Sequence, residues 1–500
     1  MLLTRAEATG FRETSLHADV MRFVRALDAL GDPRLFVTSF GESPGGRELP
    51  LLVLSKEGVR TPEEARRTGR PVVLIMDGIH PGEVEGKEAS LALVRDLLAD
   101  KHPSWLDDLV LLVVPLFNPD GNDALDPANR RLDLKKLSGQ NGPLVGTRTQ
   151  SQGINLNRDY LRQAAPEMRL LQQGVCHPWA PDLTIDNHAT NGSVHRFHMT
   201  VDVPHTVESG RIEPIAFMRE RLVPEVMEAV RARGFDSGWY GNFVEDERLL
   251  DAEKEIDPES LVGLGWETYP HHPRFGSNYR GLTNRLDLLL ECYSYLPFEE
   301  RVKTASAWQI ETLSWAQRHA GEIRRVVTAS ARPPERVAVR YRLEATDTPV
   351  DILTRRPRTF AGEPVTVRIP HHARFVGTVV VDRPRAYLVP PRLAEALRGH
   401  GLRVESAEGD HEVEVARVAS LGATEGRSIL EAARVGEMAV EWKRGVRRAP
   451  EGWSRVDTDQ PLGAIAVYLC EPESDDGAVE NGFLEAPAVG EEYGVWRVRG

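Results

Sequence analysis

Two residues of metal-binding type stand three positions apart in the segment His80-Pro81-Gly82-Glu83. Imidazole nitrogens and carboxylate oxygens are both good zinc ligands. The apolar run 72–76 precedes the pair and an amphipathic stretch, 84–98, follows it. The pair is therefore expected in a strand-to-helix turn, at the carboxyl end of a strand, where open α/β sheets place their ligands. A lone match of this kind is also common in ordinary surface turns.

A third ligand is predicted at His188, which follows the strand-like run 183–186. A catalytic zinc commonly has two histidines, one carboxylate and one open position, so His188 would complete such a set. His195 and His198 are competing candidates, although His198 is expected to belong to the next strand. Taken singly, each is also consistent with a hydrogen-bonded histidine at a strand end. Asp186 could hydrogen-bond to a metal ligand without touching the metal itself, or it could be only a charge at a sheet edge.

A carboxylate, Glu291, stands near the end of the apolar run 286–292. Burying it there is costly unless it is used or paired. A general base beside a zinc-bound water needs such a setting. The alternative is a partner for a buried arginine such as Arg285. In a strand, Cys292 would point to the opposite face and serve in packing.

Asn157 and Arg158 stand side by side in the segment 153–160. A guanidinium matches a carboxylate with two parallel hydrogen bonds, so this pair can bind one. The alternative is an arginine in a surface turn. The segment Asn118-Pro119-Asp120-Gly121 follows a buried strand and by itself indicates only a turn.

In their order along the chain, these five segments resemble the zinc carboxypeptidase family, the carboxypeptidase A-like metallocarboxypeptidases, in its diverse bacterial-type branch. The resemblance covers roughly residues 35–320. It implies that His80, Glu83 and His188 hold one Zn²⁺ per chain. It also implies that Glu291 is the general base that takes a proton from the zinc-bound water.

The resemblance assigns further roles around the substrate. The Asn157-Arg158 pair would bind its terminal carboxylate. Arg130 would polarise the scissile carbonyl, with Arg131 as the second candidate. The family's mobile tyrosine would be Tyr279, with Tyr269 as the second candidate.

The function that the resemblance implies is hydrolysis of the C-terminal amide bond of a peptide. The alternative is a zinc-dependent amidohydrolase, or deacylase, that acts on acyl amino acids. Both substrates carry a free carboxylate. A third interpretation is a catalytically silent binding module, which the complete set of predicted ligands and base argues against.

The elements that must position these residues alternate along the chain. Nearly continuous apolar runs are typical of strands buried on both faces of a parallel sheet. Helical spacing separates them. This pattern predicts an α/β fold: a mixed, largely parallel sheet flanked by helices, followed by a smaller β-rich C-terminal domain. The expected strands are 49–54, 72–76, 109–116, 183–186, 197–203 and 286–292, and the expected helices are 84–98, 212–232 and 299–328.

A competing hydrolase motif is present in Gly41-Glu42-Ser43-Pro44-Gly45, which matches the nucleophile elbow of serine esterases. That elbow must lead into a helix. Here it leads into the strand 49–54, so a hairpin turn is expected instead.

The break at Ser330-Ala331-Arg332-Pro333-Pro334 predicts a domain boundary. We expect a zinc carboxypeptidase-like catalytic domain over 1–330 and an accessory β-rich domain over 331–500.

The charge balance and the cysteines narrow the class of protein further. Lys and Arg number 62 against 75 Asp and Glu, a net charge of −13, so a nucleic-acid partner held by a broad basic face is not expected. No apolar run is long enough to span a membrane. No secretory signal is visible and the three cysteines form no disulfide framework. A cytoplasmic location is therefore expected.

Overall fold

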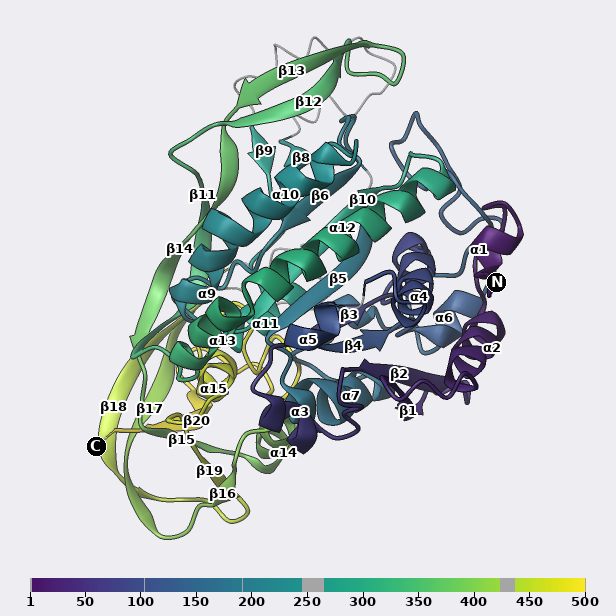
Figure 1. Ribbon diagram of the computed structural model, residues 1–500. Helices are drawn as coiled ribbons and strands as arrows, with labels where there is room; N and C mark the ends of the chain where they lie inside the picture. Colours follow the sequence, from purple (N-terminus) through teal and green to yellow (C-terminus); the bar gives the residue numbers. More distant parts are fainter. Residues whose placement is uncertain (1, 103, 191, 245–264, 423–436, 500) are drawn as a thin grey trace.

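The computed structural model describes residues 2–102, 104–190, 192–244, 265–422 and 437–499. Within these residues the centre is an eight-stranded sheet in the order β1-β2-β4-β3-β5-β10-β6-β7 (Figure 1). Strands β4, β3, β5 and β10 are parallel, and antiparallel pairs join β1 to β2, β2 to β4 and β6 to β10. The predicted mixed, largely parallel sheet is confirmed. Its strands are β1 (Leu35–Glu42), β2 (Glu48–Leu54), β3 (Val72–Met76), β4 (Val110–Val114), β5 (Leu183–Thr190), β6 (Met199–Asp202), β7 (Ser237–Trp239) and β10 (Leu286–Tyr293).

The central strands are buried on both faces because every residue of β3 and β4 is apolar. Successive side chains of a strand point to opposite faces. Val73 and Ile75 therefore enter one apolar cluster, and Leu74 and Met76 enter the other. Such a sheet has to be covered by other elements on both sides.

Helices that come before residue 330 cover the first face. Side chains of α2, α4, α10 and α12 share one buried cluster with the strands, and the long α12 crosses in front of the sheet in Figure 1. The helices in this part are α1 (Arg5–Ala8), α2 (His17–Asp28), α4 (Glu85–Leu98), α5 (Trp105–Asp108), α9 (Ile212–Phe217), α10 (Val223–Ala232), α12 (Phe298–Arg318) and α13 (Ala320–Ala329).

The second face is covered partly by residues far along the chain. A single buried apolar cluster joins Leu74 of β3 and Tyr160 to Leu393 and Ile465 of the C-terminal region, defined here as residues 331–500. The two parts therefore share one core. The helices on this side and at the sheet edge are α3 (Pro62–Thr68), α6 (Pro119–Asp123), α7 (Pro166–Leu171), α8 (His177–Trp179), α11 (Gly276–Leu282), α14 (Pro391–Gly399) and α15 (Gly463–Cys470).

The C-terminal region is β-rich, as predicted. It also extends into the first part, because β11 and β14 form a sheet with the short strands β9 and β8. Helix α13 ends at Ala329, next to the predicted boundary. The division 1–330 and 331–500 stays a prediction. The strands are β8 (Asn242–Phe243), β9 (Trp266–Glu267), β11 (Arg336–Ala345), β12 (Val350–Arg356), β13 (Glu363–Ile369), β14 (His371–Asp382), β15 (Ala386–Val389), β16 (Glu405–Ser406), β17 (Asp410–Leu421), β18 (Met438–Arg448), β19 (Ser454–Asp457) and β20 (Glu492–Val498).

The serine motif at residues 41–45 lies in the hairpin between β1 and β2. Ser43 Oγ donates a hydrogen bond to Asp120 Oδ1 at 2.7 Å. The segment leads into a strand, so it lacks the strand-to-helix geometry that a nucleophile elbow requires.

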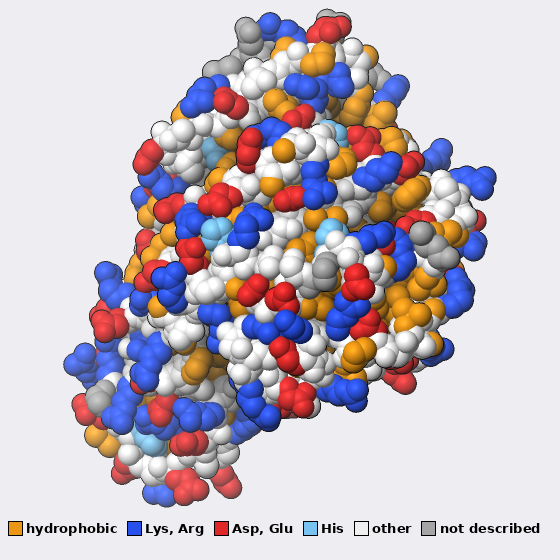
Figure 2. Space-filling view, in the orientation of Figure 1, with side chains coloured by type: hydrophobic (Ala, Val, Ile, Leu, Met, Phe, Trp, Pro, Cys, Tyr) orange, Lys and Arg blue, Asp and Glu red, His pale blue; other side chains and the backbone are white. Residues whose placement is uncertain are grey.

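On the face drawn in Figure 2, basic and acidic side chains are interspersed. No helix among the described residues combines the length and apolar character needed to cross a bilayer. The three cysteines are free thiols, and Cys292 packs against backbone carbonyls opposite Glu291 on β10.

Candidate functional site

The predicted metal ligands meet at the carboxyl edge of the sheet. His80 and Glu83 lie in the turn between β3 and α4, and His188 lies near the end of β5. Strands β3 and β5 are parallel neighbours, so their carboxyl ends lie at the same edge. Glu291 is paired in register with His188 on the next parallel strand, β10.

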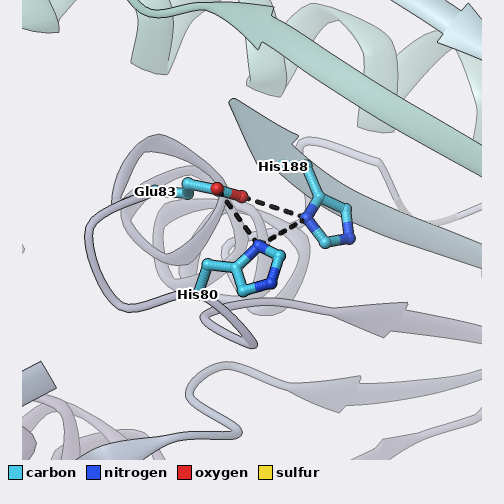
Figure 3. Close-up of side chains that lie close together, drawn as sticks. All are labelled: His80, Glu83 and His188. Atoms are coloured by element: carbon cyan, nitrogen blue, oxygen red, sulfur yellow. Dashed lines mark hydrogen bonds and ion pairs between the residues drawn. The ribbon is translucent and has the colours of Figure 1, made fainter. Parts of the chain in front are cut away.

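The three side chains face one another (Figure 3). His80 Nδ1 lies 3.1 Å from Glu83 Oε1, and His188 Nδ1 lies 3.0 Å from Glu83 Oε2. The two Nδ1 atoms are 3.3 Å apart. The side chains are buried, with exposed fractions of 3%, 5% and 2% for His80, Glu83 and His188. These residues form a group whose ligand atoms can share one ion.

The outer nitrogen of each imidazole faces an oxygen that can accept its proton. His80 Nε2 lies 3.0 Å from Asn155 Oδ1, and His188 Nε2 lies 3.2 Å from Asp186 Oδ1. An Nε2 that donates its proton leaves Nδ1 as a lone-pair donor. Zinc-ligating histidines typically have this kind of support. Two nitrogens and a carboxylate oriented in this way are a donor set that fits Zn²⁺.

A buried ion network supports His188 from behind. Arg280, on α11, contacts Asp186 and Asp287 and donates from Nη1 to the Tyr160 hydroxyl at 2.9 Å. The two carboxylates are at most 1% exposed and Arg280 is 6% exposed. Asp186 is thus held on one side by the arginine and faces the histidine on the other.

A cavity of about 610 Å³ opens over the cluster. Its charged groups are three arginines and two carboxylates, an excess of positive charge even without a metal ion. Such a lining favours an anionic ligand. Among its residues are His80, Glu83, Arg130, Arg148, Asn157, Arg158, Tyr240, Tyr269, Phe275, Ser277 and Glu291.

Glu291 lines this cavity. Burial raises its pKa to about 8, with a further contribution from the charge of Glu83, while His188 opposes the shift. A carboxyl group whose pKa lies near neutrality is suited to accept and return a proton. The alternative partner, Arg285, instead contacts Asp182 at 3.4 Å.

Of the two arginines weighed from the sequence, only Arg130 reaches the cavity. Its Nη2 donates to Glu83 Oε1 at 2.5 Å, and its backbone is in the left-handed region with φ of 45°. Arg131 is exposed to solvent. Sequence reasoning missed Arg148, whose Nη1 lies 3.3 Å from His80 Nδ1. Its only sequence signal is its position in the long turn-rich stretch before Asn157.

Asn157 and Arg158 lie in a short 3₁₀ turn, Leu156–Arg158, and both line the cavity. Asn157 Oδ1 accepts a hydrogen bond from Gly276 N at 2.8 Å. The Arg158 guanidinium carbon stacks over the Phe275 ring, 3.9 Å from its centroid. Arg158 Nη1 also donates to Asn157 O at 2.7 Å. A guanidinium stacked on one face keeps its N–H groups in the plane in which a planar anion is bound.

The structure does not bring Tyr279 to this site. Tyr279 is absent from the cavity lining, and its hydroxyl lies 2.8 Å from His400 Nδ1 of the C-terminal region. The second candidate, Tyr269, lines the cavity but donates its hydroxyl to Val203 O at 3.0 Å. Tyr240 also lines the cavity and was not singled out in the sequence; it stands two residues before Asn242 of β8.

The competing histidines lie outside the cluster. His195 is buried against Tyr293, with ring centroids 3.9 Å apart. His198 precedes β6, accepts from Asp236 N at 3.0 Å and lies 3.2 Å from Glu300. Neither contributes an atom to the three-residue group.

Comparison with known proteins agrees with this geometry. Residues 20–181 match the family model described as zinc carboxypeptidase. The match spans His80, Glu83, Asn157 and Arg158 and ends before His188. No curated protein matches the chain.

Solved structures with a similar arrangement include three carboxypeptidases. A metallo-carboxypeptidase from Burkholderia cenocepacia is 18% identical over 61% of this chain and 70% of that chain, with a TM-score of 0.41. One from Pseudomonas aeruginosa, in complex with (2-guanidinoethylmercapto)succinic acid, is 19% identical over 63% and 71%, with a TM-score of 0.41. The carboxypeptidase A of Helicoverpa armigera is 15% identical over 64% and 75%, with a TM-score of 0.37. These likenesses are too distant to carry a functional argument.

The family match therefore carries the assignment. It confirms the resemblance drawn from the sequence, and with it the expectations of Zn²⁺ as the metal and of peptide hydrolysis as the class of activity. Residues 20–181, about a third of the chain, are thus similar to zinc carboxypeptidases.

Proposed function

We propose that the protein is a metallocarboxypeptidase that removes the last residue from a peptide with a free C-terminal carboxylate. The observation that carries the proposal is the pair of Nδ1 atoms of His80 and His188 facing one carboxylate, Glu83, below a cavity with excess positive charge. The family match supports the metal and the class of reaction. The bond cleaved and the residue roles below are our proposal.

His80, Glu83 and His188 would hold the zinc ion. When bound, zinc supplies Lewis acidity, which acidifies water and polarises a carbonyl group. Glu291 takes the proton of the attacking water on its carboxylate and passes it to the leaving amine. Burial raises the pKa of Glu291 toward the neutral range, where a carboxyl group can both accept a proton and give it up.

Arginines fix the substrate around that base. Arg158 binds the terminal carboxylate with two parallel hydrogen bonds, and Asn157 lines the same wall. Arg130 stabilises negative charge on the scissile carbonyl oxygen. Arg148 projects into the same part of the cavity and adds to the positive potential there. Binding the carboxylate selects which amide bond meets the base, because it fixes the distance from the chain end.

We expect the zinc-loaded protein to hydrolyse an N-blocked dipeptide with a free C-terminal carboxylate. The same dipeptide with its C-terminus amidated should not be hydrolysed, since a carboxamide cannot make the paired contacts with Arg158. Activity should disappear with a chelator and return with added Zn²⁺. The measurement is a rate on matched acid and amide substrates, made together with metal analysis.

The same screen separates the other functions. Turnover of acyl amino acids without turnover of dipeptides would favour the deacylase. Zinc binding without turnover of either would favour a silent binding module. A fluorophosphonate that labels Ser43 and abolishes activity would favour a serine esterase. The hydrogen bond from Ser43 to Asp120 argues against that outcome.

A further inference from the structure

One wall of the cavity is built from residues 268–277, called here the wall segment. It supplies Tyr269, Phe275 and Ser277 to the cavity lining. It also touches both residues proposed to bind the substrate carboxylate. Phe275 carries the Arg158 guanidinium, and Gly276 N donates to Asn157 Oδ1. The position of the wall segment therefore sets the position of that pair.

The wall segment is attached to the C-terminal region at several points. Thr268 N donates to His372 O at 3.1 Å, next to the pairing of β9 with β14. His271 Nε2 lies 2.8 Å from Asp475 Oδ2. The attachment nearest to Phe275 is Arg274, whose partner is Asp476.

The Asp476 carboxylate accepts hydrogen bonds from both the backbone and the side chain of Arg274. Asp476 Oδ2 accepts from Arg274 N at 2.9 Å, and Oδ1 accepts from Arg274 Nε at 2.9 Å and Nη2 at 2.5 Å. Asn481 Nδ2 donates to Asp476 Oδ1 and to its backbone oxygen. Asp476 is fully buried and Arg274 is 3% exposed. Charge-assisted bonds in such a setting fix both backbone and side chain.

We infer that Asp476 is a positioning residue for recognition of the substrate carboxylate. It holds Arg274, so that the next two residues, Phe275 and Gly276, keep Arg158 and Asn157 in place. This gives the C-terminal region a part in substrate selection. The inference rests on the proposed function for its substrate, but the coupling from Asp476 to the wall segment does not.

The first test is Asp476→Asn, which keeps the shape of the side chain and removes its charge. We expect KM for an N-blocked dipeptide acid to rise about tenfold, the size of effect expected when a stacked guanidinium loses its place, with kcat little changed. The ratio of kcat/KM for the acid over the amide should fall by a similar factor. Zinc content should stay at the wild-type value.

A matched control removes a different buried pair in the same region. Glu471 contacts Arg497 and the Tyr387 hydroxyl and touches no residue of the wall segment. Glu471→Gln should cost stability as Asp476→Asn does, yet leave the acid-to-amide ratio unchanged. A second variant, Phe275→Leu, removes the ring under Arg158 and spares the Asp476 contacts. It should lower the same ratio even if Asp476→Asn folds poorly.

Amide hydrogen exchange tests the coupling without substrate. Peptides within 268–282 should exchange faster in Asp476→Asn and at the wild-type rate in Glu471→Gln. Unchanged exchange, or equal losses on acid and amide substrates, would overturn the inference. A wild-type protein that hydrolyses no carboxylate substrate would refute the proposed function, and the exchange experiment would still decide on Asp476.

Discussion

His188→Ala is expected to release the zinc ion and with it all hydrolytic activity. The substitution removes one of three donors, and the group that can share one ion has no fourth member within the described part of the chain. Losing a residue that merely supports a ligand typically costs about 10–100-fold in metal affinity, so losing a ligand should cost more. Zinc content of the purified variant and titration with a competing chelator measure this.

Two further variants test whether the loss of zinc is specific to His188. Asp186→Asn keeps all three ligands, weakens the support behind His188 and removes the charge that Arg280 pairs with, so its loss of affinity should lie near the 10–100-fold range. His198→Ala should bind zinc like the wild type, because His198 contacts Asp236 N and Glu300 instead. Loss of zinc in His198→Ala with retention in His188→Ala would contradict the ligand assignment.

Glu291→Gln is expected to keep its zinc and lose about 10²–10⁴-fold in kcat, the usual contribution of a general acid–base group. The amide has nearly the shape of the carboxylate and cannot accept the proton of the attacking water. KM should change little, because the carboxylate-binding residues are untouched. Steady-state kinetics on the N-blocked dipeptide acid, at matched zinc content, give both quantities.

The control is the same exchange of Glu for Gln away from the cavity. Glu300 is 3.2 Å from His198 and its side chain is 39% exposed, so Glu300→Gln should retain wild-type kcat. Full activity of a zinc-loaded Glu291→Gln would remove Glu291 from the reaction and leave Glu83 and the arginines to be tested.

The sequence predicted the meeting of His80, Glu83, His188 and Glu291 for a physical reason. Each belongs to the end of an apolar run, and the carboxyl ends of parallel strands share one edge of a sheet. Once the runs are recognised as parallel strands, the site follows from topology, without knowledge of the loops between them. His195, which also follows a strand end, packs instead against Tyr293, and topology alone does not predict that.

Residues on irregular segments were harder to predict. Tyr279 lies on α11, and its contact with His400 joins positions 121 residues apart, which no local pattern reveals. Arg148 and Tyr240 come from loops that carry no periodic signal. The wall segment is positioned by side chains of the C-terminal region. The sequence of that region showed no cluster of catalytic or metal-ligating residue types. Long-range packing decided these positions.

The apolar cluster that runs from Leu74 to Ile465 has a consequence for how the chain is made. During synthesis the strands that carry the zinc ligands leave the ribosome long before α14 and α15 exist. Until then, part of the apolar surface of these strands is not packed against its native partners. The completed enzyme is thus expected to mature late, as one cooperative unit, and an early release of the first 330 residues would favour aggregation over activity.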